Sequence, residues 1–170
     1  MRLIKGFILA LVGLFIMITL VSLLIPSKVQ VSRGVVVTAA APIVFAEIAD
    51  LHNWKHWQPV FRSDSAKINF APDNNSCEWE SNGKKNKLVI TARVENQVSV
   101  TLQSTGENDV NYNIAILPLP DSNTVQVEWN ALSRLKWYPW EKFYGIFIER
   151  SSGQGYEDAL NSLKAWVESH

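Results

Sequence analysis

The sequence predicts an α+β fold in which a curved antiparallel sheet of about seven strands wraps around one long C-terminal helix. Three observations predict it. Apolar and polar residues alternate from residue 29 to 37 and again, in six short runs, from about 68 to 131. A helical apolar stripe follows from 156 to 167. An uncharged apolar run occupies residues 6 to 27, so one further helix precedes the sheet.

The N-terminal run is long enough to cross a membrane. Roughly 20 apolar residues at about 1.5 Å per residue span a hydrocarbon core of about 30 Å. A cleaved signal peptide has a shorter apolar stretch, about 7–15 residues, and ends in small residues such as Ala-x-Ala. This run is longer and ends in Leu-Leu-Ile-Pro-Ser. We predict an uncleaved signal anchor over residues 1–27 and one globular domain over 28–170.

Basic residues flank the anchor on both sides. Arg2 and Lys5 precede the run, and the positive-inside rule therefore places the N-terminus in the cytoplasm. The domain would then lie outside the cytoplasmic membrane, in the periplasm if the cell is bacterial. Lys28 and Arg33 follow the run, and by the same rule they favour a cytoplasmic location for the flank after the run. They therefore oppose this orientation.

The composition restricts the partners. With 16 basic and 16 acidic residues, the chain lacks the basic excess that nucleic-acid binding needs, and we expect no nucleic-acid partner. Cys77 is the only cysteine, so an intrachain disulfide is impossible. Seven tryptophans favour an apolar binding site, because tryptophan often lines cavities and interfaces. The alternative is that they fill the core.

Residues 41–59 contain the most informative motif. Pro42 suits the first turn of a helix, since its missing N–H would have no partner there. Trp54 and Trp57 share a face of the next turn, and Pro59 ends that turn. The apolar residues on one face of the first helix are Val44, Phe45 and Ile48.

Six strands then follow, joined by turn sequences such as Asn82-Gly83, a strong hairpin signal. One face of this meander is apolar and needs a cover. The C-terminal stripe supplies it, with helical spacing from Tyr156 to Val167. A second helical piece runs from about 139 to 150, and we expect Ser-Ser-Gly-Gln-Gly at 151–155 to break or kink the helix between them.

This order of strand, two short helices, six strands and long helix resembles the helix-grip fold. The 41–59 motif is similar to the opening of the START-like, Bet v 1-like superfamily (SRPBCC), which includes the polyketide cyclase/dehydrase proteins. The resemblance covers residues 29 to about 168, and together with the anchor predicted over residues 1–27 the chain resembles a membrane-anchored member. It implies a cavity between sheet and helix that holds lipids, sterols, polyketides or other hydrophobic molecules. Some members catalyse cyclisation or dehydration there.

The candidate binding residues follow from the inward face of the strands. We expect the cavity to be lined by Trp79, Ile90, Val100, Tyr112, Ile114 and Trp129. Trp54 and Trp57 would sit at its mouth. If these large side chains fill the space, no cavity remains.

A second aromatic motif lies at 137–145, Trp-Tyr-Pro-Trp-Glu-Lys-Phe-Tyr-Gly. Three interpretations stay open. Trp137 and Tyr138 could form a lid or wall of the cavity, the motif could lie at the membrane interface, where Trp and Tyr are favoured, or it could pack against the sheet.

No residue pattern points to catalysis. His52 and His56 are four apart, but a zinc site needs three or four ligands. We expect no metal, no cofactor and no catalytic residue, because the acids fall on the polar face of the strands. The predicted function is the binding of a hydrophobic small molecule or lipid in a membrane-anchored domain. A cyclase/dehydrase-like enzyme is the first alternative, and a non-catalytic protein-interaction module is the second.

Overall fold

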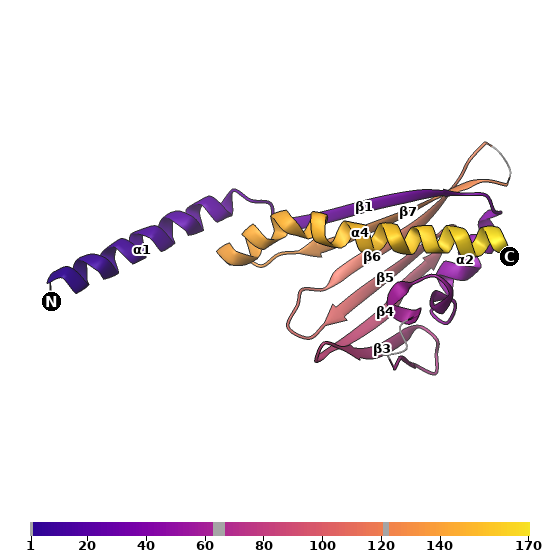
Figure 1. Ribbon diagram of the computed structural model, residues 1–170, viewed down its shortest axis with the longest axis horizontal. Helices are drawn as coiled ribbons and strands as arrows, with labels where there is room; N and C mark the ends of the chain where they lie inside the picture. Colours follow the sequence, from indigo (N-terminus) through magenta and orange to yellow (C-terminus); the bar gives the residue numbers. More distant parts are fainter. Residues whose placement is uncertain (1, 63–66, 121–122) are drawn as a thin grey trace.

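The computed structural model describes residues 2–62, 67–120 and 123–170 and contains helices at both ends of one sheet (Figure 1). The helices are α1 (Arg2–Leu23), α2 (Ala41–Ala49), the 3-10 helix η1 (Asn53–His56), α3 (Pro59–Arg62) and α4 (Pro139–Ser169). The strands are β1 (Lys28–Val37), β2 (Asn69–Phe70), β3 (Ser76–Ser81), β4 (Lys84–Val94), β5 (Gln97–Ser104), β6 (Val110–Pro118) and β7 (Val125–Arg134).

The seven strands form one antiparallel sheet in the order β1-β7-β6-β5-β4-β3-β2. Strands β2 to β7 are a meander, and β1 pairs with β7 from Lys28↔Arg134 to Val37↔Val125. The predicted α+β class and element order are therefore confirmed. The hairpin predicted at Asn82-Gly83 is also present, and both residues have left-handed φ angles of 52° and 71°. Asparagine and glycine tolerate that region, which a type I′ turn requires.

One face of the sheet carries the core. Along β7 the buried side chains alternate strictly, because successive side chains point to opposite faces of a strand. The C-terminal half of α4 packs its apolar stripe into this core. The buried residues of that stripe are Ala159, Leu160, Leu163 and Val167.

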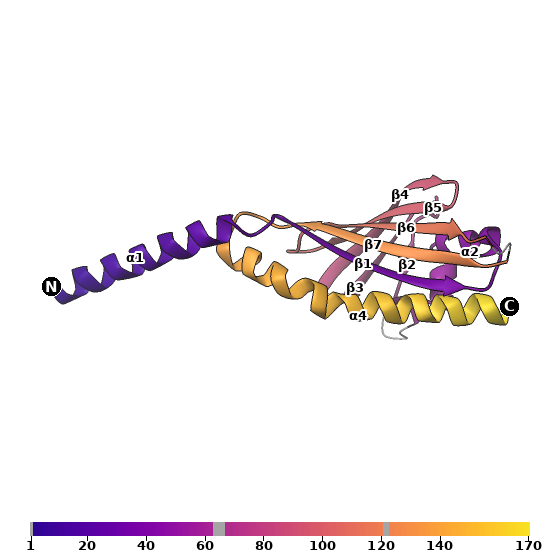
Figure 2. The same cartoon turned by 90° about the horizontal axis from the view of Figure 1, so that it is seen from above.

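Of the break or kink predicted at 151–155, the break is absent, because α4 is one helix of 31 residues. Figure 2 shows that α4 bends along its length, its N-terminal part running at an angle to the C-terminal part. Gly153 allows a close approach to β1: a Cβ there would lie 2.3 Å from Nη2 of Arg33. An interior glycine costs a helix about 1 kcal/mol, an amount that burial of one large apolar side chain offsets.

Helix α1 extends away from the sheet (Figures 1 and 2). Among the described residues it is the one helix long and apolar enough to cross a membrane, with a mean hydropathy of 2.7 over Leu3–Leu23. A signal sequence would meet the same criterion. The length and composition of α1 agree with the anchor predicted over residues 1–27.

Candidate functional site

An aromatic cluster fills the end of the core next to α2. Trp54 and Trp57 lie there against Trp129 of β7, with ring centroids 6.0 and 5.8 Å away. Both are fully buried, with 1 % and 0 % of their surface exposed. The structure thus places these two residues inside the core rather than at a cavity mouth.

The two indole groups are held by the end of α2. Nε1 of Trp54 donates to the carbonyl of Ile48 at 3.1 Å, and Nε1 of Trp57 donates to the carbonyl of Glu47 at 3.4 Å. The last carbonyls of a helix have no partner within the helix, so these bonds satisfy them. The 41–59 motif therefore serves to lock α2 onto the sheet.

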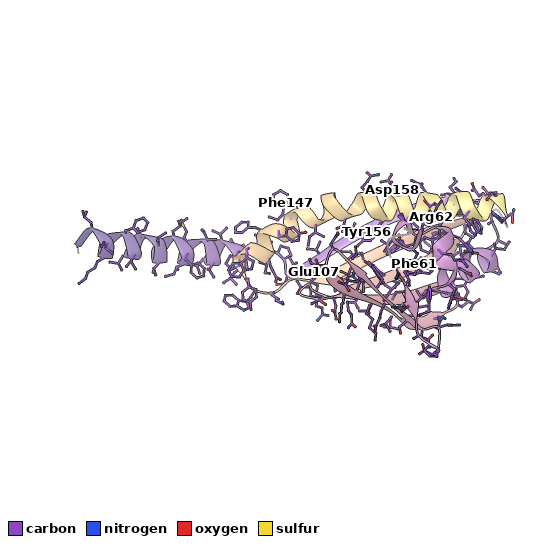
Figure 3. All side chains as sticks on the ribbon, turned by 60° about the horizontal axis from the view of Figure 1, so that its bottom comes forward. Phe61, Arg62, Glu107, Phe147, Tyr156 and Asp158 are labelled. Atoms are coloured by element: carbon purple, nitrogen blue, oxygen red, sulfur yellow. The ribbon has the colours of Figure 1, made fainter. Side chains whose placement is uncertain are left out.

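A pocket of about 270 Å³ lies between the N-terminal half of α4 and strands β1, β6 and β7. Its apolar lining consists of Val29, Val31, Val110, Ala131, Leu135, Tyr144, Ile148 and Tyr156. The other lining residues are Gly106, Glu107, Asn108, Ser133, Glu141 and Ser152. Figure 3 shows Tyr156 on the sheet side of α4, with Phe61 of α3 and Glu107 of the β5–β6 turn on either side.

A wider, open groove of about 800 Å³ lies beside it, over strands β3, β4 and β5. Its inner wall includes Trp79, Asn86 and Ser104, the last two joined by a hydrogen bond of 2.7 Å. Its rim carries charged residues of both signs, including Lys67 and Glu80. Residues 103–105 line the groove and 106–108 line the pocket, so the β5–β6 turn separates the two.

Residues at the same end of the sheet line both hollows, and we name this end the anchor end after the anchor predicted for α1. Here β1 begins at Lys28 opposite Arg134, the last residue of β7. The β5–β6 turn and the Asn82-Gly83 turn lie at this end as well, and α1 leaves the domain from it (Figure 1). The short helices, with Trp54 and Trp57, occupy the opposite end.

The ten residues proposed from the sequence are distributed differently. Of them, Trp79 alone lines either hollow among the residues that the structure describes. The side chains that pack in the core between the hollows and the short helices are Ile90, Val100, Tyr112, Ile114 and Trp129. Trp137 is exposed and Tyr138 is half-buried; both precede α4 without lining the pocket.

Three core residues connect the aromatic cluster to the pocket. Tyr156 lines the pocket, and its ring lies 5.8 Å from Tyr112 and 5.3 Å from Trp129. Burial raises the pKa of the Tyr112 hydroxyl well above its usual value, and the pKa of Tyr156 is raised for the same reason. Both phenols are therefore neutral at physiological pH and hydrogen-bond to each other.

Among the pocket-lining residues that sequence reasoning missed, Glu141 has the best-defined hydrogen bonds. Its carboxylate accepts hydrogen bonds from Nδ2 of Asn108 at 3.0 Å and from the backbone N–H of Lys136 at 2.8 Å. The bond from Asn108 is the main reason that the pKa of Glu141 is lowered. A signal existed in the sequence, because Glu141 shares a helical face with Gly145 and Ile148, but the apolar neighbours at 140, 143 and 144 concealed it.

The remaining reactive side chains are engaged elsewhere. His56 contacts Glu47 at 3.0 Å and stacks on Trp166, and His52 stacks on Phe70. Within the described ranges, no three His, Cys, Asp or Glu residues form a group that could hold a metal ion. Burial raises the pKa of the Cys77 thiol to about 12, so it is a poor nucleophile.

The fold has close structural relatives. A START superfamily protein from Mycobacterium smegmatis superposes with a TM-score of 0.63 at 18% identity, covering 83% of this chain and 98% of its own. A Staphylococcus aureus protein of unknown function gives a TM-score of 0.64 at 14% identity, covering 84% of this chain and 94% of its own. No protein-family model matches the sequence, and no curated protein matches it.

The chain shares the fold of this START superfamily protein. This fold packs a long C-terminal helix on a curved antiparallel sheet, as α4 packs on β1 and β7 here. At identities below 20% the likeness concerns the fold alone. Within the part of the chain that the structure describes, the pocket beneath α4 and the groove over β3, β4 and β5 are the two hollows that a ligand could occupy.

Proposed function

We propose that this chain is a membrane-anchored START-like domain that binds a hydrophobic small molecule or lipid beneath the N-terminal half of α4. The observation that supports this proposal is the pocket of about 270 Å³, which has mostly apolar walls and a few polar groups. Binding sites for small molecules have this character, and their volumes begin at about 300 Å³. The volume therefore suits a small ligand or one part of a lipid.

The polar groups near the pocket suit recognition. The indole Nε1 of Trp129 is buried and has no hydrogen-bond partner among the described residues. Leaving such a donor unpaired costs about 1–3 kcal/mol, so a ligand that supplies an acceptor would gain affinity. Trp129 packs against Tyr156, which lines the pocket, so a ligand reaches this donor only where the Tyr156 ring moves aside.

The cyclase/dehydrase alternative has less support from the geometry. Proton transfer needs a group whose pKa lies near the working pH. Glu141, a carboxylate of the pocket, has a lowered pKa and stays ionised, because Asn108 and the N–H of Lys136 hold it. An ionised, well-bonded carboxylate orients a ligand more readily than it delivers a proton.

The anchor belongs to the same proposal. Helix α1 would cross the cytoplasmic membrane, with Arg2 and Lys5 on the cytoplasmic side, and the domain would lie outside it. Its partners would be the hydrophobic ligand and the membrane itself.

Native mass spectrometry of the full-length protein in detergent tests the ligand. Ser152→Phe places a phenyl group in the pocket, whereas Asn161→Phe places one on the exposed outer face of α4. We expect a bound hydrophobic mass to be lost from Ser152→Phe and retained in Asn161→Phe. Lipid held around α1 would be the same in both variants, so the difference reports on the pocket. Equal bound mass in both folded variants would contradict the proposal.

A further inference from the structure

The N-terminal half of α4 presents an aromatic surface to the outside. We define the outer aromatic face as Trp137, Trp140, Phe143, Tyr144, Ile146 and Phe147. Four of these residues follow the helical spacing i, i+3, i+4, i+7 and form a single stripe. The exposed fraction is 63 % for both Trp140 and Phe147. A stripe of this kind normally faces a protein core.

The same helix changes character farther on. The exposed positions of its C-terminal half carry no large apolar side chain, and most are polar or charged, among them Gln154, Glu157, Asp158 and Asn161. Figure 3 shows Phe147 and Asp158 both on the side of α4 away from the sheet, whereas Tyr156 points toward the sheet. The outer side of one helix is thus apolar near α1 and polar far from it. Large exposed apolar patches mark contact with a protein or a membrane.

No charge projects from the outer aromatic face. The two charged residues between positions 137 and 148 are Glu141 and Lys142. Glu141 turns to the pocket, and Lys142 is buried, with 3 % of its surface exposed. Across residues 137–148, burying this face in lipid would therefore desolvate no charged side chain, and desolvation of charge is the main cost of membrane insertion.

The structure also fixes where this face lies relative to α1. Nζ of Lys142 donates to the backbone carbonyl of Ile25 at 2.9 Å and to the hydroxyl of Ser27. These two residues belong to the short link between α1 and β1. A link this short, held to α4, keeps the start of α4 beside the end of α1. If α1 spans a bilayer, the outer aromatic face lies at the surface of that bilayer.

We propose that the outer aromatic face of α4 sits in the interfacial layer of the phospholipid bilayer that α1 crosses. Tryptophan and tyrosine favour this layer, where one end of the ring is apolar and the other is wet. The docked face turns the anchor end of the sheet, and both hollows, toward the bilayer. Tyr144 belongs to the face and to the pocket lining. The ligand of the pocket is then a lipid-derived molecule that is exchanged with this bilayer. This statement about the ligand rests on the function proposed above.

Site-specific fluorescence in nanodiscs tests the docking. The full-length protein is reconstituted at one copy per disc in zwitterionic phosphatidylcholine, with an environment-sensitive maleimide dye on Phe147→Cys or, as the matched control, on Asp158→Cys. The buried Cys77 thiol, whose pKa is about 12, stays unlabelled, and the wild-type chain is the labelling blank. Lipids with a nitroxide near the top of the acyl chain quench dyes that lie in the interface.

We expect the dye at position 147 to emit at shorter wavelength and to be quenched at least about threefold more than the dye at 158, since an interfacial helix sinks about 5–10 Å into the bilayer. Equal, weak quenching at both positions would overturn the proposal. A blue shift at 147 that appears only in discs with two copies would also overturn it, because a second chain would then cover the face. This readout needs no pocket ligand: quenching at 147 without a pocket-dependent bound mass would contradict the ligand proposal and leave the docking intact.

Discussion

The ammonium group of Lys142 donates a hydrogen bond of 2.9 Å to the backbone carbonyl of Ile25, 117 positions earlier in the chain. This contact joins the start of α4 to the end of the apolar helix α1. It places a buried lysine between the end of α1, the pocket and the outer aromatic face. This side chain ties α1 to the helix that covers the pocket, and the N–H of Leu135 holds the same link by donating to the carbonyl of Ser27 at 2.8 Å.

Replacing this lysine should loosen the link. Lys142→Met keeps the length of the side chain and removes its donors, and a hydrogen bond contributes about 1 kcal/mol. We expect the amides of Leu24 and Ile25 to exchange with deuterium roughly five times faster, because they close the last turn of α1. Lys164→Met, on the exposed part of the same helix, is the control. Unchanged exchange in Lys142→Met would show that the link is held by other contacts.

Two glycines of α4 should respond in opposite directions to the same change. A methyl group added at Gly155 would have nothing within 4 Å, so Gly155→Ala should raise the free energy of unfolding by about 0.5–1 kcal/mol. At Gly145 the methyl carbon would lie 2.3 Å from Cδ1 of Leu135 and 3.2 Å from Cγ2 of Val29. Overpacking costs about 1–3 kcal/mol, so Gly145→Ala should lower the free energy of unfolding. Urea unfolding in detergent measures both, and a gain in stability for Gly145→Ala would refute the close packing of α4 on β1.

The carboxylate of Glu141 should make stability depend on pH. Its pKa is lowered in the folded protein by Asn108, below the usual value of 4.5. A lowered carboxyl pKa stabilises the folded state fully above pH 4.5, and that contribution is lost as the pH falls through the folded pKa. We expect wild type to be more stable than Glu141→Gln at neutral pH, with the difference shrinking in acid. Urea midpoints at several pH values check this, and a difference independent of pH would disprove it. Glu157→Gln, at an exposed position of α4, controls for surface charge.

The fold was predictable because its signals are local. Strict alternation from Val125 to Ala131 specifies a strand with one buried face, and the spacing from Tyr156 to Val167 specifies a helix with one buried stripe. Asn82-Gly83 needs the left-handed backbone that only a few residues accept readily. Each of these patterns constrains its own segment, whatever the remainder of the chain does.

The candidate site was less predictable, because its walls come from segments far apart in the chain. Val29, Leu135 and Glu141 line one pocket only because β1 pairs with β7 and α4 crosses both strands. Trp54 and Trp57 have the composition of a cavity mouth, but the free carbonyls at the end of α2 bind their indole groups. These carbonyls lie only six and ten positions earlier in the chain, but the burial of both rings against Trp129 depends on long-range packing.

In the N-terminal half of α4 the apolar stripe faces outward, whereas the apolar stripe of an amphipathic helix usually faces the core. Its apolar stripe, including Trp140 and Phe147, is exposed, while the face with Gly145 and Lys142 packs inward. Periodicity identifies an amphipathic helix but assigns the apolar face to the core by assumption. Here the opposite face packs inward, because Gly145 permits a close approach and Lys142 binds two oxygen acceptors.

The sequence by itself determined the strands, the helices, their order and the apolar N-terminal helix of this protein, since each depends on the period of burial along the chain. The tertiary structure alone decided that α4 runs unbroken with a bend, that the tryptophans close the far end of the core, and that the pocket opens at the anchor end. Those features arise where segments far apart in the chain meet, as Lys142 meets Ile25 and Trp54 meets Trp129, and no local pattern encodes such a meeting.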